Sequence, residues 1–307
     1  MGMLVEGSWS DEEVRRTNSS GEFVRNVSDF RDAVATGSDT FAPEAGRYHL
    51  FVNAGCPWAY RTILYRALKQ LDDVVGLSFT EPAMGKQGWT FGEPELLLGA
   101  RHIHDVYTAA VPDFTGRTTV PVLWDKERHT IVNNESSEII RMFDSAFDHL
   151  PGVEATRFYT QELSAQIDRW NERIYLDVNN GVYRCGFARS QQAYEQAYDN
   201  LFGLLDEIET HLADSRYLCG DTITEADWRL FSTLVRFDAA YYSAFRCNRN
   251  RLTDFEHLWG YTRDLYQQPQ VAPTVDMAAI KGIYFGGRPP GIIPKGPDLD
   301  FWAPHSR

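Results

Sequence analysis

One cysteine stands where a thiol can react. Cys56 comes between a short apolar run that is typical of a strand and a segment with helical spacing that begins at Pro57. Proline is favoured at the first helical position because its missing N–H has no intrahelical partner there. The N–H groups and the dipole of a helix start favour an anion, so they lower the pKa of a thiol at that place. Because position 59 is Ala, no neighbouring cysteine can resolve a disulfide, and we predict a reactive monothiol that needs an external thiol.

The remaining cysteines and the histidines indicate no metal site. Cys185, Cys219 and Cys247 lack the strand–Cys-Pro–helix context, so we interpret them as reduced, buried structural thiols. His102 and His104 are the only close pair of histidines, and no local cysteine or histidine completes a set of metal ligands. We therefore expect no bound metal.

Two further segments could bind a ligand. At Val120-Pro121 a loop enters a strand, and a cis peptide there would leave the Val120 backbone able to pair with an extended ligand, although few X–Pro bonds are cis. Glu135 and Ser136 stand at the start of the next predicted helix. They form either an ordinary helix cap or a site in which Ser136 and backbone N–H groups hold a carboxylate and Glu135 holds an ammonium. Spacing alone leaves both interpretations open.

The elements around these residues divide the chain near residues 151–152. The first half combines strand and helix signals, with strands predicted at 48–52, 74–79, 120–124 and 129–132 and helices at 57–71 and after 135. Such a half is expected to fold as a sheet with helices on its faces. The second half has helical periodicity and no strand signal of similar quality, over segments 154–178, 190–213, 224–245 and 251–268.

One helix start in the second half is unusually clear. Thr224 and Asp227 have the spacing of a capping box, and Ile223 and Trp228 flank it as a hydrophobic staple. We interpret this motif as local helix nucleation, with the cap contributing about 1 kcal/mol.

Composition argues against several classes of protein. A chain of 307 residues suggests two domains, and 30 basic against 43 acidic residues give a net charge of −13. That charge argues against nucleic acid and anionic membrane as partners. There is no apolar run of 18 residues and no pattern of a secretory signal near the start, so we expect a cytoplasmic protein.

A series of short motifs runs in order along nearly the whole chain. They are GRYHL at 46–50, CPWA at 56–59, GWTF at 88–91, TGR at 115–117, VPVLWDK at 120–126, VNNES at 132–136, NGVY at 180–183, RFD at 236–238 and GIIPKGP at 291–297. Each motif is weak alone, but together they are specific. The chain resembles the glutathione transferase family, and within it the xi class, the glutathionyl-hydroquinone reductases. The GIIPKGP motif is absent from ordinary glutathione transferases.

The resemblance implies a fold, a domain order and an assembly. The fold is an α/β thioredoxin-like N-terminal domain followed by an all-α C-terminal domain, usually as a homodimer. The expected parts are an N-terminal extension (1–45), the thioredoxin-like thiol-binding domain (46–150), the helical domain (151–282) and a C-terminal tail over the aromatic-substrate pocket (283–307).

The resemblance also implies roles for individual residues. Cys56 would be the catalytic nucleophile. The thiol-cofactor site would use Trp89, Arg117, Val120, Glu135 and Ser136. The aromatic-substrate pocket, with its candidate proton donors, would use Tyr183, Tyr241 and Tyr284.

The implied reaction is the reductive deglutathionylation of glutathionyl-hydroquinones, with glutathione as co-substrate. Cys56 would form a mixed disulfide that a second thiol resolves, without metal, nicotinamide or flavin. The partners would therefore be quinone and hydroquinone conjugates. An omega-like thiol transferase that acts on mixed disulfides or dehydroascorbate, and a non-enzymatic thioredoxin-like scaffold, are the alternatives.

Two departures from the family pattern concern the thiol. Tyr60 stands where these reductases commonly have His, and the segment between Trp89 and Asp105 is short. The low-molecular-weight thiol is therefore glutathione or, alternatively, mycothiol, bacillithiol or γ-glutamylcysteine.

Overall fold

The computed structural model describes residues 2–12, 16–287 and 291–307, and the chain forms two compact units. The first unit contains Met1–Arg15, Val27–Thr156 and Pro273–Ile293, and the second contains Arg16–Asn26, Arg157–Ala272 and Pro294–Arg307. Each unit therefore consists of three separate segments of the chain, including one from near each end, whereas the sequence predicts consecutive domains. Residues 1, 13–15 and 288–290 of the predicted extension and tail lie outside the described residues.

The first unit is built on a four-stranded sheet in the order β4-β3-β5-β6. The strands are β3 (Tyr48–Val52), β4 (Val75–Phe79), β5 (Val122–Asp125) and β6 (Thr130–Asn133). Strand β3 is parallel to β4 and antiparallel to β5, which is antiparallel to β6. Four of the five β3 side chains are buried, as expected for a strand covered on both faces. The predicted strands are confirmed to within two residues.

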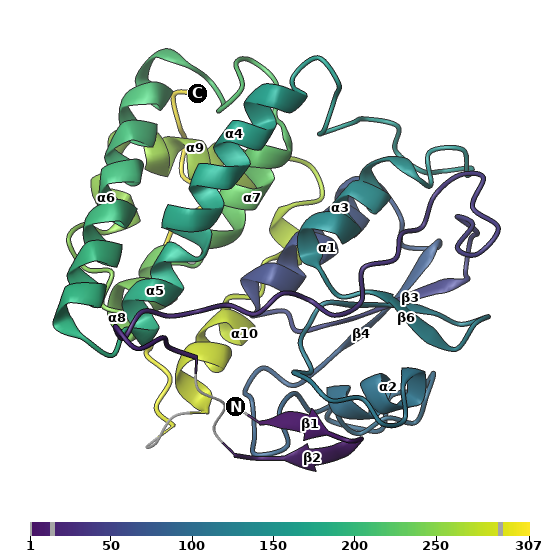
Figure 1. Cartoon of the computed structure of the whole chain (residues 1–307). Coiled ribbons are helices and arrows are strands. Elements are labelled where there is room, and N and C mark those ends of the chain that lie inside the picture. Colours follow the sequence, from purple (N-terminus) through teal and green to yellow (C-terminus); the bar gives the residue numbers. More distant parts are fainter. Residues whose placement is uncertain (1, 13–15, 288–290) are drawn as a thin grey trace. The chain divides into compact units, whose positions relative to one another are not determined.

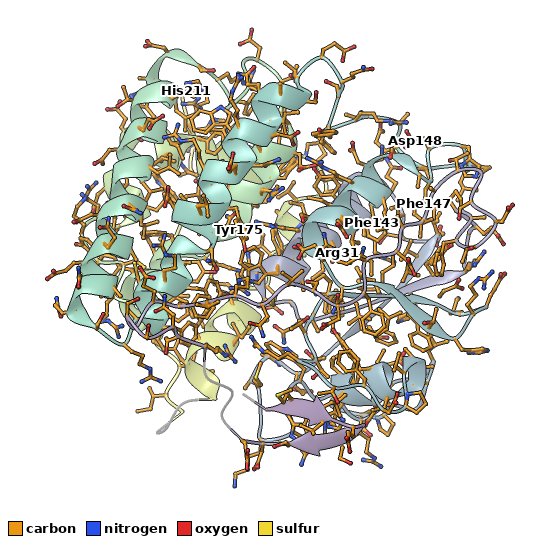
Figure 2. The ribbon with its side chains drawn as sticks, in the orientation of Figure 1. Arg31, Phe143, Phe147, Asp148, Tyr175 and His211 are labelled. Carbon is orange, nitrogen blue, oxygen red and sulfur yellow. The ribbon has the colours of Figure 1, made fainter. Side chains whose placement is uncertain are left out.

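Helices cover both faces of this sheet (Figure 1). Helices α1 (Pro57–Leu68) and α3 (Ser136–Ser145) pack against each other on one face, and α2 (Ile103–Ala110) lies on the other. Phe143 and Phe147, labelled in Figure 2, are fully buried, and the Phe147 ring meets Tyr48 of β3 edge-on with 6.0 Å between ring centroids. The predicted thioredoxin-like arrangement is therefore confirmed.

Both ends of the chain add to the first unit. Strands β1 (Met3–Val5) and β2 (Ser8–Ser10) form a hairpin within the segment predicted as an N-terminal extension. Leu4 and Gly116 exchange two backbone hydrogen bonds, which attach the hairpin to the loop before β5. Near the other end, α10 (Met277–Lys281) continues into a π-helical turn, Gly282–Gly286.

Every named element of the described second unit is a helix or helical turn, as predicted. The α-helices are α4 (Ser164–Ile174), α5 (Gly181–Phe187), α6 (Gln191–Asp214), α7 (Glu225–Leu234), α8 (Tyr242–Ala244) and α9 (Glu256–Tyr266). Helix α6 packs against α5 and α9, and α4 packs against α7. Among the described helices, none is both long and apolar enough to cross a membrane.

The predicted long helices of this unit are interrupted by other turns. Segment 154–178 becomes helical only at Ser164 and ends in the π-helical turn Tyr175–Asn179, while a second π-helical turn, Phe237–Tyr241, lies between α7 and α8. Short 3-10 turns occur at Leu252–Asp254 and Ala272–Thr274. The C-terminal tail packs on α9, where the Phe301 and Tyr266 rings stack with centroids 4.8 Å apart.

The capping box at the start of α7 is confirmed, and it does more than nucleate a helix. Thr224 donates from its backbone N–H and its hydroxyl to Asp227 Oδ2, at 2.7 and 2.9 Å. Asp227 Oδ1 accepts from the Leu218 N–H at 3.0 Å and from the Tyr261 hydroxyl at 2.8 Å. One buried carboxylate therefore joins α7, the preceding loop and α9.

Candidate active site

Cys56 is the N-cap residue of α1, with φ −71° and ψ 122°, and only 6% of its surface is exposed. Its backbone N–H donates to Asn53 Oδ1 at 3.1 Å, and the Gly55 N–H donates to the same oxygen at 3.0 Å. The Asn53 amide in turn donates to Thr80 Oγ1 at 3.0 Å and to the Glu81 carbonyl at 2.8 Å. The fully buried Asn53 side chain therefore fixes the turn that presents the thiol at the helix start.

The returning C-terminal segment packs directly on this turn. A Cβ on Gly55 would lie 2.4 Å from the Ala279 carbonyl oxygen and 2.9 Å from Ile283 Cγ2, so only glycine allows this approach. The next residue after Ile283 is Tyr284, which is buried in the π-helical turn. The first unit therefore brings the Tyr284 segment against the Cys56 turn.

Glu135 and Ser136 lie at the start of α3, and Glu135 is its N-cap. Glu135 Oε1 accepts from the Ser137 N–H at 3.1 Å and from the Ser137 hydroxyl at 2.9 Å, while Oε2 accepts from the Ser28 hydroxyl at 3.0 Å. Ser136 is buried, and its hydroxyl accepts from Arg61 Nη1 at 3.5 Å. The helix-cap interpretation is confirmed, and the ligand-binding interpretation is taken up under the proposed function.

The other residues expected at a thiol site belong to the same unit. The Val120–Pro121 peptide is cis, which is one of the two possibilities that the sequence left open. Trp89 and Val120 are buried, and Arg117 is half-buried. The Trp89 carbonyl accepts from the Ile103 N–H at 2.9 Å, which ties its loop to the start of α2.

The three predicted aromatic-pocket residues are divided between the units. Tyr284 lies in the first unit, whereas Tyr183 and Tyr241 lie in the second, with 6.2 Å between their ring centroids. Phe245 packs against both of these rings, at 5.2 Å from Tyr183 and 5.5 Å from Tyr241. The Arg25 guanidinium lies 4.9 Å from the Tyr183 ring centroid. The sequence analysis identified neither Phe245 nor Arg25, because only the fold brings them to Tyr183.

Tyr60, the departure from the family pattern, is fully buried one turn after Cys56. Its hydroxyl lies 3.1 Å from Thr274 Oγ1, which leads into α10. Tyr60 therefore joins α1 to the returning C-terminal segment.

The other cysteines are free and buried. Burial raises the pKa of Cys219, and burial together with a hydrogen bond to Cys185 raises the pKa of Cys247. A raised pKa makes these thiols poor nucleophiles, in accord with a structural role. No cluster of three potential metal ligands occurs among the residues that the structure describes.

Comparisons with known proteins cover both halves of the chain. Residues 55–146 match the family model described as "Glutathione S-transferase, N-terminal domain", and residues 191–264 match "Glutathione S-transferase, C-terminal domain". The glutathionyl-hydroquinone reductase PcpF of Sphingobium chlorophenolicum is 45% identical over 97% of this chain and 96% of its own. The glutathionyl-hydroquinone reductase YqjG of Escherichia coli is 43% identical over 100% of this chain and 98% of its own.

Solved structures agree with these matches. A xi class glutathione transferase from Natrialba magadii superposes with a TM-score of 0.91 at 43% identity, covering 100% of this chain and 96% of that one. The glutathione-bound structure of YqjG superposes with a TM-score of 0.90 at 41% identity, covering 100% and 99%. The chain therefore belongs to the glutathionyl-hydroquinone reductases, the xi class of glutathione transferases.

Proposed function

We propose that this protein catalyses the glutathione-dependent reductive deglutathionylation of glutathionyl-hydroquinones through Cys56. The observation that carries the proposal is the position of Cys56, the N-cap of α1 in a turn with no second cysteine. Backbone N–H groups at a helix start stabilise a thiolate, which is the nucleophilic form of cysteine. A single thiolate suits chemistry that passes through a mixed disulfide with an external thiol.

The reaction balances in two steps. The Cys56 thiolate attacks the glutathionyl sulfur, an S–S bond forms, and the C–S bond to the ring breaks. The electron pair goes to the ring carbon, which takes a proton, and the hydroquinone leaves. The thiolate of a second glutathione then attacks the mixed disulfide, which yields glutathione disulfide and restores Cys56. The ring carbon is reduced from C–S to C–H, while the thioether sulfur of the conjugate and the thiol of one free glutathione become one disulfide.

Residues of the first unit suit the peptide part of this substrate. Glu135 would pair with the α-ammonium, and Ser136 with the first N–H groups of α3 would hold the α-carboxylate. The Val120 backbone would pair with the cysteinyl part of the peptide. Trp89 would form one wall of the site, and Arg117 would reach the peptide from the loop before Val120.

The tyrosines suit the aromatic part. Tyr183 and Tyr241 lie in a cluster with Phe23, Phe187 and Phe245, and such a set of rings can pack against a planar hydroquinone. Their hydroxyls and that of Tyr284 would hydrogen-bond the ring oxygens and help to place the proton on carbon. The C-terminal tail would cover this pocket.

A γ-glutamyl thiol suits the first unit best, and we propose glutathione. A carboxylate and a helix start form a natural pair of partners for the zwitterionic end of a γ-glutamyl thiol. Glutathione and γ-glutamylcysteine have that end, whereas mycothiol and bacillithiol do not. We further propose a cytoplasmic homodimer that needs no metal, and light scattering of the purified protein tests the dimer.

Turnover of glutathionyl-menadiol tests the proposed function. We expect stoichiometric menadiol and glutathione disulfide when glutathione is added, less product with mycothiol or bacillithiol, and none from Cys56→Ser. If menadiol is not released, while a glutathionylated peptide or dehydroascorbate is reduced, the protein is instead an omega-like thiol transferase. If Cys56 reacts with none of these compounds, the proposal is wrong, and the remaining alternatives are the same chemistry on conjugates of another low-molecular-weight thiol and a non-enzymatic scaffold.

A further inference from the structure

The segment 28–34, here called the edge segment, pairs with the end of β6 and the start of α3. The Phe30 N–H donates to Asn134 Oδ1 and the Asn134 N–H donates to the Phe30 carbonyl, each at 3.1 Å. The Asp32 N–H donates to the Val132 carbonyl at 3.1 Å. Arg31, labelled in Figure 2, forms an ion pair with Glu138 on α3. The edge segment is therefore fixed at the point where α3 begins.

This pairing places the Ser28 hydroxyl on the Glu135 carboxylate. Ser28 donates to Oε2 at 3.0 Å, while Ser137 donates twice to Oε1. Without Ser28, the carboxylate would be held only through Oε1, by the two bonds from Ser137, and its plane would be less firmly oriented. A carboxylate can accept about four hydrogen bonds. The three observed bonds therefore orient both oxygens and leave capacity for one more donor.

We infer that Ser28 is a positioning residue that orients the Glu135 carboxylate for the ammonium of a γ-glutamyl thiol. This inference rests on the proposed function, because it assigns the partner of Glu135. Ser28 stands 107 positions from Glu135 in the sequence and outside the two halves that match the family models. The preference for one thiol over another thus depends on a residue in the segment that precedes the sheet.

The expected effect is on thiol binding rather than on bond breaking. Holding a mobile side chain in one geometry costs binding free energy, and Ser28 removes that cost because it orders the Glu135 carboxylate before the thiol arrives. We expect Ser28→Ala to raise the KM for glutathione about fivefold, with kcat at saturating thiol little changed. Ser28→Thr retains the hydroxyl and should restore the KM.

A matched thiol separates this role from a merely structural one. N-acetylglutathione, acetylated on the γ-glutamyl amine, has no ammonium for Glu135 to bind. Ser28→Ala should therefore leave the KM for N-acetylglutathione unchanged, whereas a general loosening of α3 would raise both values. Arg31→Lys is the control within the edge segment, because it keeps the positive charge near Glu135 and loses the paired guanidinium bonds to Glu138, so it should affect both thiols equally.

Binding provides the readout that does not depend on turnover. Calorimetric titration of Cys56→Ser protein with glutathione should show an affinity about fivefold weaker once Ser28→Ala is added. Equal affinities, or equal effects of Ser28→Ala on both thiols, would overturn the inference while leaving the proposed function intact. If the wild type turns over no conjugate and glutathione does not bind, the proposed function and the inference are both wrong.

Discussion

Replacing Asn53 by Ala should destabilise the protein and disturb the Cys56 turn together. The substitution removes four short bonds, two that Asn53 accepts from Gly55 and Cys56 and two that it donates to Thr80 and Glu81, besides a long, weak bond of 3.4 Å to the Pro82 carbonyl. At about 1 kcal/mol for each bond, the total is about 4 kcal/mol. The Cys56 N–H keeps a 3.2 Å bond to the Asn53 backbone carbonyl, so we expect a loss of about 3 kcal/mol in the free energy of unfolding.

Urea unfolding of the wild type and Asn53→Ala measures this loss. The pH dependence of Cys56 alkylation by iodoacetamide measures the pKa of the Cys56 thiol. Asn53→Asp keeps an oxygen that accepts from Gly55 and Cys56 but loses the bonds donated to Thr80 and Glu81, so it should cost less stability than Asn53→Ala. It also adds a negative charge beside the helix start, so Cys56 should be alkylated more slowly at neutral pH. Asn248→Ala, at an exposed position, is the control and should change stability by less than about 0.5 kcal/mol. An Asn53→Ala protein as stable as this control would refute the reasoning.

Three further predictions concern stability. Gly55→Ala should push α10 away from the Cys56 turn and lower the melting temperature of the protein. Gly203→Ala should raise the melting temperature, because a Cβ there meets no neighbouring atom and alanine favours the helix. Calorimetric scans in which Gly55→Ala melts at or above the temperature of Gly203→Ala would contradict the close contact between Gly55 and α10. Hydrogen bonds from Arg31 hold the pKa of Glu138 below its ordinary 4.5, so their stabilisation is present above that pH and is lost as the pH falls below it. The destabilisation by Glu138→Gln, taken from unfolding curves, should therefore shrink between pH 7 and pH 3, and a constant difference would disprove the pairing. Asp227→Ala removes a buried carboxylate with four hydrogen bonds, so urea unfolding should show a loss of about 3 kcal/mol or more in the free energy of unfolding. An unchanged free energy of unfolding would show that this carboxylate does not join the loop, α7 and α9.

Most strands and helix starts could be predicted, because each depends on residues that are close together in the sequence. The apolar runs predict β3 to β6, and Pro57 predicts the start of α1 at the residue where it begins. The same holds for the capping box, where Thr224 and Asp227 are three residues apart. Interruptions such as the π-helical turns at Tyr175–Asn179 and Phe237–Tyr241 have no comparable local signal, because packing against neighbouring helices decides them.

The supporting residues of the candidate site could not be predicted, because their partners are distant in sequence. Ser28 meets Glu135 only when the edge segment pairs with β6, and Gly55 meets Ala279 only when the chain returns from the second unit. Asn53 did have a local signal, since an Asn beside a turn commonly accepts N–H groups two or three residues on. A search for that pattern before the Cys-Pro pair would have found it.

The central claim is that Cys56 takes the glutathionyl group from a hydroquinone. The direct measurement is the intact mass of the protein after one turnover with glutathionyl-menadiol in the absence of free thiol. We predict a mass gain of one glutathione per chain, equimolar release of menadiol, loss of the adduct on adding glutathione, and no adduct on Cys56→Ser. An unchanged mass with no menadiol, or an adduct that persists in Cys56→Ser, would contradict the account.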